Sequence, residues 1–155
     1  IQFLFDERLK HESPTDVQKA VLQITRHHPK LESLYIASCY LLYLEFARPD
    51  LCEEIILDGL KAFPLSWRIP VAQAFMYGYV LKQWDQSASY YALAASKPKS
   101  PPFIKKLIPK IMDERRLSID DITNTLKSMS NDDGGSKLSE FLNELHKRRQ
   151  ERKSQ

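Results

Sequence analysis

The sequence predicts an all-α fold of successive helical hairpins, for three reasons. Apolar residues recur at three- and four-residue steps in one segment after another, which is the period of an amphipathic helix. The 9 prolines fall mostly between these segments, where they begin or end helices. Glycine is scarce, with only 4 residues, and this argues against a β-rich fold full of tight turns. At 155 residues the chain fits one domain with a sizeable core.

The first part of the chain predicts two helices. Residues 1–11 carry apolar side chains spaced for a short helix. Ser13 is then a suitable helix cap, with Pro14 in the first helical position and Asp16 placed to reach back toward the cap. This second helix is expected to end near His27, because a proline two residues later disfavours helical backbone in the residue before it.

The first complete hairpin that the pattern predicts has its first helix over 30–46, a connection that ends at 49–50, and a second helix that follows it to about Phe63. The helix over 30–46 is apolar around nearly its whole circumference, so we expect neighbouring helices to cover it on most sides. In the second helix, Asp50 is predicted to be the N-cap and Glu53 to bond back to it.

Residues 67–82 and 85–96 predict the next hairpin. Pro70 must lie in the first turn of its helix, where the missing N–H costs no hydrogen bond. Asp85 is the predicted N-cap of the return helix. The small residues 92–95 indicate a close approach of backbones.

Two helices and a linker are predicted after this hairpin. The helix over 103–114 is expected to bend at Pro109. Ser118 opens a capped helix that runs to about Met129. The predicted organisation is a helical repeat domain over 1–130, a glycine-containing linker over 131–135, and a capping helix with a basic tail over 136–155.

The two hairpins share a spacing. Pro64 and Pro98 lie 34 positions apart, and about 34 residues is the repeat length of the tetratricopeptide family. The motif positions of that family are matched by Tyr43, Cys52, Ile56 and Gly59 in one hairpin, and by Trp84, Ser87, Tyr91 and Ala94 in the next. Over about residues 30–98 the chain therefore resembles a tetratricopeptide repeat (TPR-like) protein. Tyr40 and Phe75 stand where the family usually has a glycine, and Pro98 falls one residue early.

The resemblance implies a fold and a function. The fold is a right-handed superhelix of antiparallel helical hairpins, or solenoid, whose first helices line a concave groove. The function is that of a non-enzymatic scaffold that binds a peptide or amphipathic helix of a protein partner. The other interpretation is that neighbouring helices cover the same residues as core. Carried over by position, the groove would present Leu34, Ala37, Leu41, Leu44, Glu45, Ile69, Ala72, Met76, Tyr79 and Val80.

An RNA-binding repeat module is the alternative function. The tail over 147–153 is basic and could contact phosphates. However, no aromatic residues are interleaved with its charges, as a platform for single strands would need. The formal net charge of +3 does not by itself demand nucleic acid. A solvated helix end is the favoured interpretation of this tail.

No pattern for catalysis, for a metal or for a cofactor is found. The sequence contains no phosphate loop and no recognisable nucleophile–base set, so we do not expect an enzyme. His27 and His28 are adjacent and would point to different faces of a helix, without a third ligand nearby in sequence. The longest apolar stretch, 34–44, is too short to span a bilayer. The chain shows no signal peptide, but it begins at Ile1 and is expected to be trimmed, which leaves an upstream signal or anchor open.

Cys39 and Cys52 allow two interpretations. They lie on the two helices of the best-matching hairpin, where they could face each other and form a disulfide. Alternatively they are two small buried thiols, which is the favoured interpretation because free cysteine is often a core residue. A Cα separation beyond about 7 Å would exclude the bond.

Overall fold

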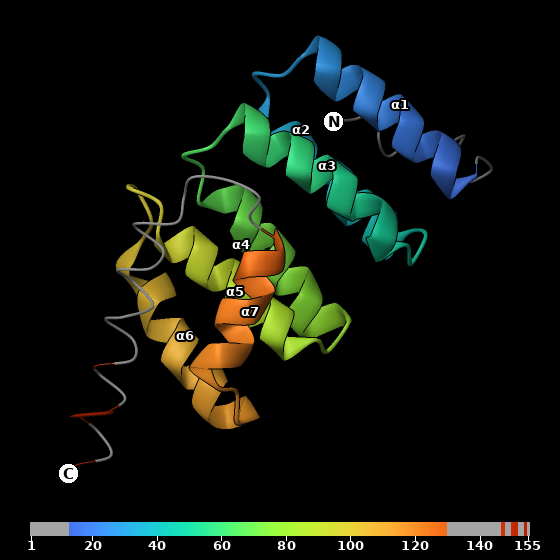
Figure 1. The fold of residues 1–155 in the computed structure, drawn as a ribbon. Helices are drawn as coiled ribbons and strands as arrows, with labels where there is room; N and C mark the ends of the chain where they lie inside the picture. Colours follow the sequence, from blue (N-terminus) through green and yellow to red (C-terminus); the bar gives the residue numbers. More distant parts are fainter. Residues whose placement is uncertain (1–12, 130–146, 148–149, 152–153, 155) are drawn as a thin grey trace. The chain divides into compact units, whose positions relative to one another are not determined.

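The computed structural model describes residues 13–129, 147, 150–151 and 154. Within these residues the chain is all-helical, with seven α-helices and no strand, which confirms the predicted all-α class (Figure 1). The chain divides into two compact units, Ile1–Leu65 and Ser66–Gln155, which are described separately. The predicted helix over 1–11 and the linker over 131–135 lie outside the described residues, as does most of the predicted capping helix.

The first unit is a bundle of α1 (Pro14–His27), α2 (Glu32–Leu44) and α3 (Pro49–Ala62). Helix α2 packs against both of the others, as its apolar circumference predicted, and α1 also contacts α3. The side chain of Gln18 ties α1 to α3 by donating to the carbonyl of Leu51 at 3.0 Å. The buried apolar residues of this core are Val17, Val21, Leu22, Leu34, Tyr35, Leu41, Leu42 and Ile55.

The second unit is arranged around α5 (Trp84–Ala95). Helix α4 (Arg68–Phe75) continues directly into a π-helix, η3 (Met76–Val80), and the chain then turns into α5. Helices α6 (Pro102–Arg115) and α7 (Ile119–Met129) follow, and α5 packs against α4, η3, α6 and α7 (Figure 1). Helix α5 is therefore in contact with every other helix that the structure describes in this unit.

Two predicted serine caps are present. Ser13 Oγ accepts a hydrogen bond from the Asp16 N–H at 3.2 Å at the start of α1. At the start of α7, Ser118 Oγ accepts from the Asp121 N–H at 3.0 Å, and the Asp121 carboxylate accepts from the Ser118 N–H at 2.9 Å. The Ser118 hydroxyl also donates to the Asp121 carboxylate at 2.6 Å, and this bond, together with the one from the Ser118 N–H, favours the ionised form and lowers the pKa of Asp121. Both helix starts satisfy N–H groups that would otherwise lack partners.

The predictions that Asp50 and Asp85 are N-caps were wrong. Helix α3 has Arg48 as its N-cap and Pro49 in its first turn, because proline already holds the backbone angle that a helix start requires. Asp50 lies inside that turn and accepts hydrogen bonds from the Arg48 guanidinium at 2.8 and 2.6 Å, which lowers the pKa of Asp50. Helix α5 likewise has its N-cap two residues earlier than predicted, at Gln83, and Asp85 lies inside its first turn.

Three helix ends use the left-handed backbone region without glycine. Ala47 has φ of 50°, Lys82 has φ of 59° and Arg116 has φ of 55°. They follow α2, η3 and α6, where the next residue donates its N–H back to the helix that has just ended. This conformation brings the Cβ close to the following carbonyl, so each of these residues carries strain that glycine would not.

Replacing Ala47 by glycine is expected to raise the free energy of unfolding by about 1 kcal/mol, because it removes this contact. The matched control is Ala20→Gly inside α1, where the backbone is helical and glycine should cost about 1 kcal/mol. Urea denaturation followed by circular dichroism measures both. A destabilised Ala47→Gly variant would contradict the assignment of the α2 end.

Candidate partner-binding surface

Some of the residues predicted to line a groove are buried in the structure, and others are exposed. Leu34 and Leu41 are buried in the first unit, and Ile69, Ala72 and Met76 are buried in the second. Ala37 is half-buried and packs against the core of its unit. Four side chains remain exposed: Leu44, Glu45, Tyr79 and Val80. Because only exposed side chains can contact a partner while the fold is intact, the candidate surface is narrower than the predicted groove.

Three exposed apolar side chains of the second unit, Phe75, Tyr79 and Val80, lie close together in sequence near the half-buried Trp84, and we call these four residues the aromatic surface. The first three are 42%, 53% and 45% exposed. The rings of Phe75 and Tyr79 have centroids 4.9 Å apart, and Tyr79 contacts Trp84 edge to face at 5.5 Å. Large apolar side chains that are exposed together mark a protein interaction site more often than scattered ones do.

The π-helix places Tyr79 and Val80 at this surface. The Leu81 N–H donates to the carbonyl of Met76, five residues earlier, at 3.1 Å. A π turn contains an additional residue compared with an α turn, so it changes the direction in which the following side chains project. Short π-helices inside α-helices are rare and are frequent at functional sites.

Gly78 packs closely against Ser87 and Trp84, where a larger residue would not fit. A Cβ atom at this position would lie 2.7 Å from Ser87 Oγ and 2.9 Å from a ring carbon of Trp84. Ser87 Oγ in turn donates to the carbonyl of Ala74 at 2.7 Å, so it is held in place. Sequence reasoning missed this role: it placed the family's glycine position at Phe75, although the glycine at 78 was the available signal.

A positive charge borders the aromatic surface. The guanidinium carbon of Arg115, at the end of α6, lies 4.1 Å from the centroid of the Trp84 ring. Such a cation–π contact contributes about 0.5–1 kcal/mol at an exposed site.

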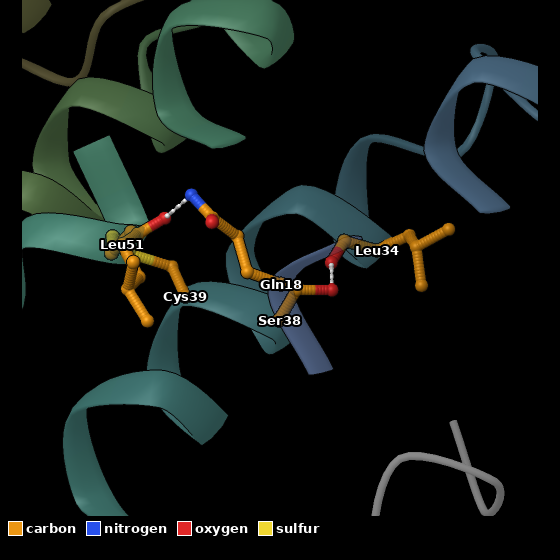
Figure 2. The surroundings of a disulfide bond; sticks show 6 residues. Gln18, Leu34, Ser38, Cys39 and Leu51 are labelled. Carbon is orange, nitrogen blue, oxygen red and sulfur yellow. Dashed lines mark hydrogen bonds between the residues drawn. A yellow bond between two sulfur atoms is a disulfide. The ribbon is translucent and has the colours of Figure 1, made fainter. Parts of the chain in front are cut away.

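The cysteines of the first unit are joined. Cys39 on α2 and Cys52 on α3 form a disulfide with a Cα separation of 4.8 Å, and both side chains are buried (Figure 2). The favoured interpretation as two free thiols was therefore wrong, because helix packing brings the two positions into bonding range. Figure 2 also shows Ser38 Oγ bonded to the Leu34 carbonyl at 2.6 Å, so the hydroxyl beside the disulfide is satisfied. This part of the unit serves stability and offers no exposed thiol.

The remaining sequence candidates give no defined site. His27 and His28 are both exposed, and the described residues contain no group of three or more His, Cys, Asp or Glu side chains placed to hold a metal ion. No helix in the described part of the chain is long and apolar enough to cross a membrane. Within the basic tail, Lys147 and Glu151 are described and exposed, and most of its other charges lie outside the described residues.

Comparison of the chain with protein-family models, with curated proteins and with solved structures finds no match.

Proposed function

We propose that this chain is a non-enzymatic protein-interaction module that binds a peptide or helix of a partner protein through the aromatic surface. The observation that carries the proposal is the joint exposure of Phe75, Tyr79 and Val80 beside Trp84. Aromatic side chains bury large areas with little loss of conformational freedom, which is why they dominate binding energy at protein interfaces. An amphipathic partner helix could place its apolar face on such a cluster.

The proposal includes a TPR-like arrangement of the hairpins. It is supported by the spacing of Pro64 and Pro98 and by the burial of the small residues at the matching positions. Cys52, Gly59, Ser87 and Ala94 are all buried. Ser87 lies directly against Gly78, as a close-packing position requires. In this arrangement the aromatic surface takes the place of the wider groove that the sequence predicts.

The test is affinity capture of partners from native extract by the full chain, compared with the Phe75→Ala/Tyr79→Ala variant. Loss of two exposed anchors is expected to reduce capture of a specific partner at least about tenfold, because truncation of one such anchor commonly costs about 2 kcal/mol. Mass spectrometry identifies the partners and binding to the purified partner gives the affinities. The variant should keep its fold, since both rings are about half exposed.

Two controls distinguish binding from folding. Leu57→Ala removes an apolar side chain of similar exposure, 41%, from α3 and should leave capture unchanged. Met76→Ala should instead destabilise the second unit by about 2–4 kcal/mol, because this neighbour of the aromatic surface is only 1% exposed. Undiminished capture by Phe75→Ala/Tyr79→Ala would show that the aromatic surface is not the binding site.

A further inference from the structure

The disulfide of the first unit is enclosed by the packing of its helices. Cys39 and Cys52 are 1% and 0% exposed. On α2, Cys39 lies four residues after Tyr35 and three residues before Leu42, so these side chains share one stripe of the helix. Tyr35 and Leu42 belong to the core that also contains the buried apolar residues of α1. A thiol in solution therefore does not reach the sulfur atoms while the unit is closed.

Helix α1 is also bonded to the turn of α3 that carries Cys52. Gln18 Nε2 donates to the carbonyl of Leu51, the residue before Cys52, at 3.0 Å, and to the carboxylate of Glu54 at 3.2 Å. Figure 2 shows Gln18 reaching toward Leu51 next to the disulfide. Because Gln18 is only 8% exposed, these hydrogen bonds lie inside the contact between the helices rather than at its edge.

The disulfide itself determines which helix of the unit can move. While the bond is intact, α2 and α3 stay joined, whereas α1 is connected to α2 only through residues 28–31 and is otherwise held by noncovalent contacts. Near the end of α1, Arg26 lies 3.7 Å from Glu54 and 3.4 Å from Asp58, and exposed ion pairs of this kind contribute little. Separation of one helix costs less free energy than unfolding of a whole unit. It is therefore the opening that uncovers the sulfur atoms most often.

We propose that the first unit is a redox switch with α1 as its cover: a dithiol reductant reduces the Cys39–Cys52 bond only after α1 has separated, and reduction then loosens this unit. A thiolate of the reductant attacks one sulfur atom and forms a mixed disulfide, which the second thiol of the reductant resolves. The reductant becomes a disulfide, and the two cysteines take up two electrons and two protons to become thiols. Both cysteines of the chain lie in the first unit, so the covalent structure of the second unit does not change.

The first test is the rate at which dithiothreitol reduces the folded full chain, measured by alkylation of the released thiols and mass spectrometry. Reduction of the folded chain should be at least about 100-fold slower than reduction of the chain denatured in urea, because only the open form reacts. Equal rates would overturn the proposal, since the helices would then not shield the bond.

Two variants identify the helix that opens. Gln18→Ala removes the hydrogen bonds of α1 to Leu51 and Glu54 and should accelerate reduction about fivefold. The matched control is Ile56→Val, which removes one carbon atom at a fully buried position of α3 outside the core that α1 shares. Urea denaturation should show a similar loss of stability for both variants. Ile56→Val should nevertheless leave the reduction rate within about twofold, because separation of α1 keeps α2 and α3 packed. Equal acceleration by both variants, or none by Gln18→Ala, would show that α1 is not the cover.

Hydrogen exchange of the oxidised chain and of the chain held reduced in dithiothreitol measures the response of each unit. Amides of α2 and α3 should exchange at least about tenfold faster after reduction, because the cross-link no longer restrains the unfolded first unit, and those of α5 should be unchanged. The Cys39→Ala/Cys52→Ala variant is the control and should not respond to dithiothreitol. Unchanged exchange in α2 and α3 after complete reduction would show that the bond does not control this unit.

Discussion

The double variant Cys39→Ala/Cys52→Ala is expected to lower the free energy of unfolding of the first unit by about 3 kcal/mol. The two cysteines are 13 residues apart, and a cross-link of about this span removes roughly that much conformational freedom from the unfolded chain. Alanine is chosen because it introduces no polar group at two positions that are at most 1% exposed. A total stability of about 5–15 kcal/mol is typical of a domain, so the loss is large.

Urea denaturation of the variant and of the unmodified chain, with and without reductant, measures this effect. Reductant should destabilise the unmodified chain by a similar amount and leave the variant unchanged. Titration of the denatured, unreduced chain with a thiol reagent should detect no free thiol. Two free thiols per chain, together with no effect of reductant, would show that Cys39 and Cys52 are not joined.

Replacing Gly78 by valine is expected to destabilise the second unit by about 3 kcal/mol, at the upper end of overpacking effects. The Cβ atom alone would lie 2.7 Å from Ser87 Oγ and 2.9 Å from Trp84, and valine adds two further methyl groups. Ser87 cannot turn away without losing its hydrogen bond to the Ala74 carbonyl. Thermal and urea denaturation give the loss in stability, and tryptophan fluorescence reports displacement of Trp84.

A mutant cycle locates the cause of this loss. Gly78→Ala should be milder, at about 1–2 kcal/mol, because alanine is a better helix former than glycine and this offsets part of the steric cost. The double variant Gly78→Ala/Ser87→Ala should lose less stability than the two single variants summed. The reason is that Ser87 Oγ, the atom nearest to the new Cβ, is absent. Strict additivity would mean that Gly78 and Ser87 are not in contact.

Features set by neighbours in sequence could be predicted. Ser13 and Ser118 cap their helices because each needs only a side chain and an N–H three residues away. The all-α class follows in the same way from the period of the apolar residues. Asp50 and Asp85 are not caps because each N-cap lies two residues earlier, at Arg48 and Gln83. Caps of similar composition compete, and local pattern alone does not decide between them.

Features set by packing could not be predicted. The disulfide depends on which turns of α2 and α3 face each other. The packing of all three helices of the unit determines this, so the residues around each cysteine do not reveal it. The predicted groove included Met76 beside Tyr79, yet the first is 1% and the second 53% exposed. Their exposures differ because Met76 faces the core of the second unit and Tyr79 faces solvent beside Phe75, which depends on how the neighbouring helices pack. No local pattern indicated the π-helix in which both lie.

The central position of α5 has a consequence for native-state hydrogen exchange. Its amides lie in a helix that α4, η3, α6 and α7 all contact, so opening α5 requires its neighbours to separate first. They should exchange with solvent deuterium only through the highest-energy opening of the second unit. Helix α7 packs chiefly on α5, and its amides should exchange through a smaller, separate opening. The second unit would then lose α7 before its remaining helices unfold together, and α5 would be the last element to be labelled.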